Sequence, residues 1–122
     1  MVILITMKHI GIDARLTHYR TGGISTYIRR TVAALEALDP AYRLTILRSR
    51  KMTRYDTRHF EQAPLWTPAH HRFERLALSV ELARFRLDLL HSPDFIPPLR
   101  GAKHHVITVH DLTFLRYPQY LT

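Results

Sequence analysis

Segments with strand periodicity alternate with segments of helical periodicity along this chain, and this alternation restricts the fold more than any other feature. Residues 8–14 are rich in isoleucine and end in polar side chains, and residues 105–110 form a β-branched run typical of a central parallel strand. Helical segments lie between the strands, which is the arrangement that produces a parallel sheet with right-handed crossovers. The sequence therefore predicts an α/β, Rossmann-like domain with helices on both faces of a parallel sheet.

The expected strands are residues 8–14, 42–47, 60–66, 87–91 and 105–110. The second alternates in a way that predicts one wetter face, and the third is bounded by prolines, which cannot donate to a sheet ladder. A helix is expected to open at Gly22-Gly23 and to stop before Asp39-Pro40. Its apolar stripe contains Ile24, Tyr27, Ile28, Thr31, Leu35 and Leu38.

A second helix is expected over residues 70–86, and it carries two apolar stripes instead of one. The first stripe contains Phe73, Leu76, Ala77, Val80, Ala83 and Leu87. The second stripe, on the nearly opposite side, contains Leu78, Leu82 and Phe85. Because both faces favour burial, we expect the second stripe to be covered by a surface outside this chain. That surface is a further protein segment, a membrane or a second copy of the chain.

The chain is strongly basic, with eighteen Lys and Arg residues against ten Asp and Glu residues and a formal net charge of +8. Such a charge attracts anionic partners, among them nucleic acid, anionic lipid and phosphorylated substrates. The densest basic stretch contains Arg48, Arg50, Lys51, Arg54 and Arg58, and we expect it to be a loop. It is either an ordinary solvated surface or, in a protein that faces a membrane, a contact with anionic lipid. Helix-turn-helix spacing, paired strand aromatics and a strongly basic helix are missing, which argues against nucleic acid.

Polar residues near the ends of the expected strands are the candidate functional residues, because ligands of open parallel sheets bind at the carboxyl ends of the strands. They are Asp13 and Arg15 after the first strand, His91 and Ser92 after the fourth, and His110 and Asp111 after the fifth. Gly22 and Gly23 lie on the same edge at a helix start, where free amides favour a phosphate. The same glycines could also simply permit a tight entry into the helix.

Two other kinds of site are disfavoured by spacing. A dinucleotide fingerprint needs three spaced glycines directly after the strand, and this loop offers two glycines further downstream. The pairs His70-His71 and His104-His105 do not chelate a metal easily, because adjacent side chains point apart on a helix or a strand. With no cysteine in the chain, thiolate and disulfide chemistry is excluded as well. We therefore expect neither a metal nor a cofactor.

Four motifs in this order resemble the amino-terminal domain of the group 1 (family 4) glycosyltransferases, which have the GT-B fold. They are Gly11-Ile12-Asp13-Ala14-Arg15, Thr21-Gly22-Gly23-Ile24, His91-Ser92-Pro93 and Thr108-Val109-His110-Asp111-Leu112-Thr113-Phe114. The resemblance runs from Met7 to the last residue. It implies transfer of a sugar, of hexosyl type, from a nucleotide-sugar donor with retention of configuration and without a metal.

Carried over residue by residue, the resemblance places Gly22 and Gly23 near the donor diphosphate and the acceptor. It places His110 by the reacting sugar with Asp111 as its neighbour, and it makes Asp13 and Arg15 acceptor-side contacts. We expect the acceptor-side role for His91 and Ser92 as well. It also implies that residues 1–122 are a partial amino-terminal, acceptor-side domain, without the carboxy-terminal nucleotide-sugar domain and without activity alone. The competing hypothesis is a non-catalytic α/β binding module for an anionic partner, either nucleic acid or a membrane surface.

A truncated parallel sheet leaves the strand at residues 105–110 with an unpaired edge or an uncovered face, so self-association into a homo-oligomer is expected. No apolar run reaches the roughly 20 residues that a membrane-spanning helix needs. The expected location is therefore the cytoplasm, with peripheral contact at the inner membrane face. The donor nucleotide, the sugar and the acceptor are not specified by any of these patterns.

Overall fold

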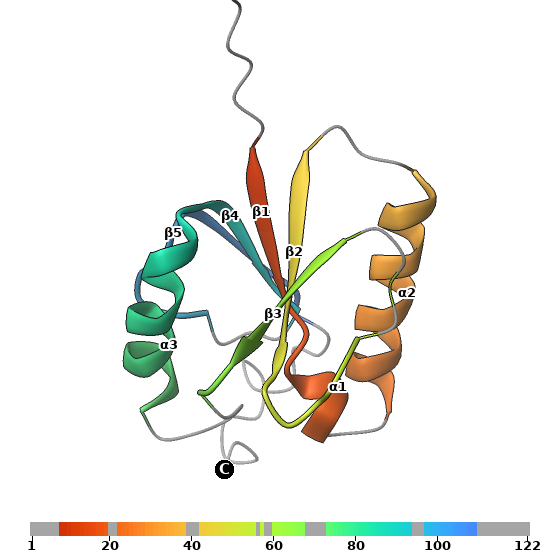
Figure 1. Cartoon of the computed structure of the whole chain (residues 1–122), viewed down its shortest axis with the longest axis horizontal. Coiled ribbons are helices and arrows are strands. Elements are labelled where there is room, and N and C mark those ends of the chain that lie inside the picture. Colours follow the sequence, from red (N-terminus) through yellow and green to blue (C-terminus); the bar gives the residue numbers. More distant parts are fainter. Residues whose placement is uncertain are drawn as a thin grey trace, which may run out of the picture.

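The computed structural model describes residues 8–19, 22–38, 42–55, 57, 60–67, 73–93 and 97–109. Within these residues five strands form one parallel sheet in the order β3-β2-β1-β4-β5 (Figure 1). The strands are β1 (His9–Asp13), β2 (Arg43–Ser49), β3 (Glu61–Leu65), β4 (Leu87–Ser92) and β5 (Ala102–Ile107). The helices are α1 (Leu16–Tyr19), α2 (Gly23–Ala37) and α3 (Glu74–Leu82), which the 3₁₀ helix η1 (Ala83–Phe85) continues.

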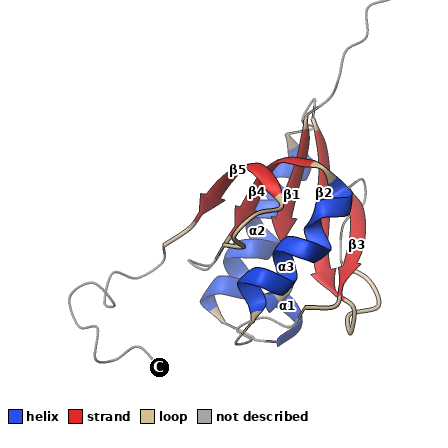
Figure 2. Cartoon of the chain, turned by 90° about the vertical axis from the view of Figure 1, so that its left-hand side faces the viewer, coloured by secondary structure: helices blue, strands red, loops and turns tan. Residues whose placement is uncertain are grey.

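The sheet lies between two helical layers, with α1 and α2 on one face and α3 on the other (Figures 1 and 2). One apolar core joins Ile28 and Val32 of α2 to β1 and β2, and a second joins Leu78 and Leu82 of α3 to β2, β3 and β4. The predicted α/β fold with a parallel sheet and helices on both faces is therefore confirmed. The strands predicted near residues 8–14, 60–66 and 87–91 are confirmed as β1, β3 and β4.

Strand β2 is buried on both faces, so the prediction of one wetter face is wrong. It pairs with β1 on one side and β3 on the other, and its residues from Leu44 to Leu47 are all buried. The buried hydroxyl of Thr45 is hydrogen-bonded to the His9 imidazole at 2.7 Å, which offsets the cost of its burial. The strand also extends to Ser49, so Arg48 belongs to β2 and not to the basic loop.

Helix α2 begins and ends close to the predicted limits, but its buried side is narrower than the predicted stripe. Its fully buried residues are Ser25, Ile28 and Val32. Leu38 is 75% exposed, because it is the residue that caps the helix and lies beyond the turns that pack on the sheet. The predicted burial of Leu38 is therefore wrong.

Helix α3 is shorter than predicted and buries the other stripe. Leu78 and Leu82 are completely covered by the sheet, whereas Phe73, Leu76 and Val80 are mostly exposed. The hypothesis that the stripe of Leu78, Leu82 and Phe85 meets a surface outside the chain is wrong for the two leucines, and Phe85 packs partly buried against the same core.

Strand β5 lies at the edge of the sheet and not at its centre, contrary to its β-branched composition. It pairs with β4, and from Lys103 to Ile107 every residue is exposed. The prediction that this strand has an unpaired edge or an uncovered face is confirmed for the described residues. Composition failed to locate the strand because β-branched residues favour any pleated strand, whatever its position in the sheet.

Candidate functional site

The carboxyl ends of the parallel strands form one edge of the sheet, at the bottom of Figure 1, and α2 begins at this edge. Asp13 ends β1, His91 and Ser92 end β4, and Thr108 directly follows β5. Gly22 and Gly23 stand at the start of α2. The topology therefore gathers most of the predicted candidate residues at the edge where ligands of such sheets bind.

Three polar side chains from separate elements meet at this edge. The Thr108 hydroxyl lies 2.9 Å from His91 Nε2 and 3.1 Å from the Tyr27 hydroxyl, and the Tyr27 and His91 rings meet edge to face at 6.3 Å. The Thr108 amide donates to the Ser92 carbonyl. This backbone bond holds Thr108 in place, and its hydroxyl contacts both Tyr27 and His91. We call Tyr27, His91 and Thr108 the rim cluster.

Burial gives the rim cluster its chemical character. The His91 ring is half-buried, and desolvation lowers the pKa of its imidazole below the ordinary value. A neutral imidazole can both donate and accept a hydrogen bond, and the two neighbouring hydroxyl groups can do the same. The rim cluster is therefore suited to binding ligand hydroxyl groups.

A small hollow of about 150 Å³ lies on the α2 face of the sheet and shares His91 with the rim cluster. It is lined by Ile10, Ile12, Leu35, Tyr42, Leu44, Leu89, His91 and Val106. Most of these side chains are apolar, and His91 belongs to both the hollow and the rim cluster. The hollow is suited to a small apolar group attached to the polar part of a ligand.

The two glycines at the start of α2 leave space at the same edge. A Cβ at Gly22 or Gly23 would meet no atom within 4 Å, and among the described residues no side-chain hydrogen bond caps the start of α2. Gly22 has φ +128°, a conformation that only glycine adopts without strain. The helix dipole and the amide groups of a first helical turn generally favour an anion. The role of Gly22 and Gly23 at a phosphate stays a prediction, and Gly22 also has a purely conformational reason to be glycine.

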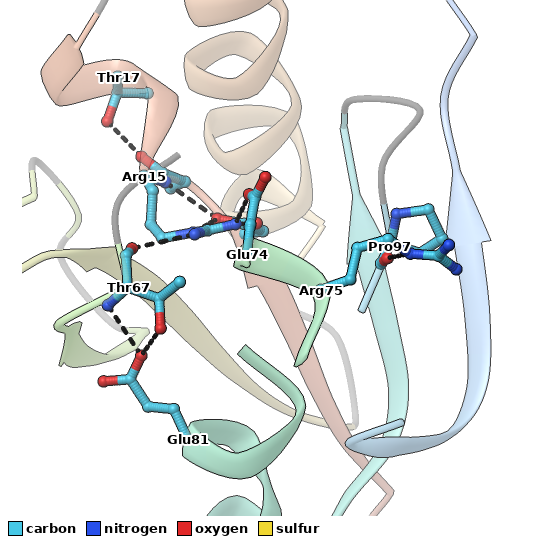
Figure 3. Close-up of polar contacts among 9 residues, drawn as sticks. Arg15, Thr17, Thr67, Glu74, Arg75, Glu81 and Pro97 are labelled. Atoms are coloured by element: carbon cyan, nitrogen blue, oxygen red, sulfur yellow. Dashed lines mark hydrogen bonds and ion pairs between the residues drawn. The ribbon is translucent and has the colours of Figure 1, made fainter. Parts of the chain in front are cut away.

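Arg15 is held by other protein groups. It is 2% exposed, and its guanidinium contacts Asp13 at 2.7 Å, Glu74 at 2.6 Å and the Thr67 carbonyl at 3.0 Å (Figure 3). Burial alone lowers the pKa of a guanidinium, but the carboxylates of Asp13 and Glu74 outweigh it and raise the pKa of Arg15. Arg15 therefore joins the end of β1 to the start of α3, and its role as an acceptor contact stays a prediction.

His91 and Ser92 serve opposite faces of the sheet, because adjacent side chains of a strand alternate. His91 contacts the rim cluster on the α2 face. Ser92 is 2% exposed, and its hydroxyl has no hydrogen-bond partner among the described residues. The two side chains therefore lie on opposite faces of the sheet, and the role of His91 and Ser92 as acceptor-side residues stays a prediction.

No protein-family model, curated protein or solved structure matches this chain. The resemblance to the group 1 glycosyltransferases therefore stays a prediction. Its two catalytic candidates, His110 and Asp111, lie outside the described residues.

Within the described part of the chain, no three His, Asp or Glu residues are grouped so that they could hold a metal. None of the helices in that part is long and apolar enough to span a membrane.

Sequence reasoning missed two members of the rim cluster. The sequence pattern places Tyr27 in the apolar stripe of the first expected helix, and it places Thr108 in a motif but not among the candidate site residues. Their pairing joins positions 81 residues apart, so no local pattern signals it. The position of Thr108 near the end of a predicted parallel strand is the one sequence signal that points to it.

Proposed function

We propose that this chain is the acceptor-side part of a retaining sugar transferase that uses a nucleotide-sugar donor. The observation that carries the proposal is the meeting of Tyr27, His91 and Thr108 at the carboxyl edge of a parallel sheet. Tyr27 lies four residues after Gly23, about one helical turn into α2. Groups for sugar hydroxyls and a helix start suited to a diphosphate therefore occur together.

In this proposal each group has a separate task. The rim cluster hydrogen-bonds hydroxyl groups of the sugar or acceptor, and the neutral imidazole of His91 does so without bringing a further charge. The start of α2 stabilises the negative charge that develops on the departing nucleoside diphosphate. His110 and Asp111 act at the reacting sugar, as the family resemblance implies. A second lobe, supplied by a nucleotide-sugar domain, orients the donor.

The first test follows binding to this chain by nuclear magnetic resonance. Nucleoside-diphosphate hexoses and inorganic pyrophosphate are titrated into isotope-labelled protein, and the backbone amide signals are followed. We expect shifts concentrated at Gly22, Gly23 and Thr108, with the Leu38 amide at the far end of α2 unaffected. Shifts spread evenly over the exposed arginines would instead indicate nonspecific anion binding and would contradict the proposal.

The second test measures sugar transfer by a polypeptide in which this chain is joined to a nucleotide-sugar domain. Tyr27→Phe and Thr108→Val each remove one hydroxyl from the rim cluster, and each is expected to lower kcat/KM about tenfold or more. Leu38→Asn is the matched control, because Leu38 is exposed and remote from the rim. Full activity in both hydroxyl variants would overturn the proposal. Failure of every tested nucleotide-sugar donor to support transfer would overturn it as well.

A further inference from the structure

The outer side of α3 carries a stripe of exposed apolar side chains. Phe73, Leu76 and Val80 are 59%, 60% and 72% exposed. Their spacing puts them on the side of the helix opposite to Leu78 and Leu82, which face the sheet. Exposed apolar side chains that occur singly are ordinary, but a contiguous stripe indicates an interaction surface.

Two further apolar residues flank α3 on its two sides. The Trp66 amide donates to the Glu81 carboxylate at 2.6 Å, and the Leu99 amide donates to the Arg75 carbonyl at 3.4 Å. Trp66 is 67% exposed and Leu99 is 56% exposed. These contacts widen the stripe into a surface, which we call the apolar face. It consists of Trp66, Phe73, Leu76, Val80 and Leu99.

Among the described residues, three arginines border the apolar face, against one carboxylate, Glu81, that no cation neutralises there. Both carboxylates of α3 are engaged within the fold, since Glu74 pairs with a buried arginine and Glu81 caps the loop after β3. Arg75 and Arg84 are exposed and donate to carbonyl oxygens, and in the described part of the chain neither has a carboxylate partner. Arg100 is also exposed. Its backbone amide donates to the hydroxyl of Ser79 on α3, which keeps Arg100 next to the helix.

We propose that the apolar face and its arginines dock this chain on an anionic lipid bilayer. Apolar side chains would enter the boundary between headgroups and acyl chains, and Arg75, Arg84 and Arg100 would bind lipid phosphates. Trp66 suits the interface because its ring is amphipathic, and the Arg50 guanidinium already lies 4.3 Å from that ring. A second copy fits less well, because two such faces in contact would bring their arginines together.

Trp66 supplies the assay, because it is the chain's single tryptophan and lies in the apolar face. The protein is mixed with vesicles of phosphatidylcholine, with or without phosphatidylglycerol. We expect the tryptophan emission to shift to the blue, and the protein to sediment, with the anionic vesicles and not with the neutral ones. Added salt is expected to weaken the binding.

Substitutions then locate the surface. Leu76→Asn combined with Val80→Asn is expected to lower vesicle partitioning about tenfold or more. Arg75→Gln is expected to lower it about fivefold. Leu38→Asn is the matched control, because Leu38 is 75% exposed in the opposite helical layer, and its partitioning should equal that of the wild type. Circular dichroism verifies that each variant is folded.

Three outcomes would overturn the proposal. The first is no emission shift with anionic vesicles. The second is binding that survives Leu76→Asn combined with Val80→Asn in a folded protein, which would assign the binding to another basic surface. The third is a dimer, detected by analytical ultracentrifugation, that this double substitution dissolves while vesicles remain unbound, which would assign the apolar face to a second copy. None of these outcomes depends on whether the chain transfers sugar.

Discussion

Replacing Arg15 with methionine is expected to destabilise the fold by about 3–5 kcal/mol, because it leaves two carboxylates buried without their cation. The Arg15 side chain is 2% exposed, and the side chains of Asp13 and Glu74 are 12% and 5% exposed. Both carboxylates would keep the cost of desolvation and lose their attraction to the guanidinium. The Thr67 carbonyl would lose a hydrogen bond in addition. This loss is a large part of the roughly 5–15 kcal/mol by which domains are usually stable.

Urea unfolding followed by circular dichroism measures the effect. The double variant Arg15→Met with Glu74→Leu is expected to be more stable than Arg15→Met alone, because it removes one of the unpaired charges. Arg84→Met is the matched control: Arg84 is exposed, so its loss should change the free energy of unfolding by about 0.5 kcal/mol or less. A cost below about 1 kcal/mol for Arg15→Met, or an equal cost for Arg84→Met, would refute the reasoning.

Three further predictions concern the backbone and pH. Gly22→Ala should lower the free energy of unfolding by about 1–3 kcal/mol, because φ is +128° at Gly22. Gly23→Ala should be neutral or slightly stabilising. Equal changes in the free energy of unfolding of the two variants, measured by urea unfolding, would refute this prediction. Gly101→Ala should cost more than Gly22→Ala, since φ is +124° and the new Cβ would lie 2.9 Å from Leu82 Cβ. Burial lowers the pKa of His91, so the unfolded chain binds its proton more readily and stability falls as pH drops through and below about 6.5. As the pH is lowered through this range, the thermal midpoint of His91→Gln should fall less steeply than that of the wild type. An equal fall in both proteins would show that His91 does not cause the pH dependence.

The fold class was predictable because local periodicity reports local geometry. The isoleucine-rich strand β1, the spacing of Ile28 on α2 and the proline stop after that helix are all readable from neighbouring residues. The placing of candidate residues at strand ends was predictable for the same reason, since a parallel sheet brings all its carboxyl ends to one edge. The membership of the rim cluster was not predictable, because His91 and Thr108 bond across two strands and Tyr27 reaches them from a helix.

By itself, the sequence determined the kinds of elements, their order and the parallel sheet that follows from strands alternating with helices. Only the tertiary structure decided which stripe of α3 is buried, that β5 is an edge strand and that Arg15 is enclosed. These outcomes depend on contacts between distant residues, such as Arg15 with Glu74 across 59 positions. An amphipathic pattern specifies that a face favours burial, but the partner that covers the face is chosen by the packing of the whole domain.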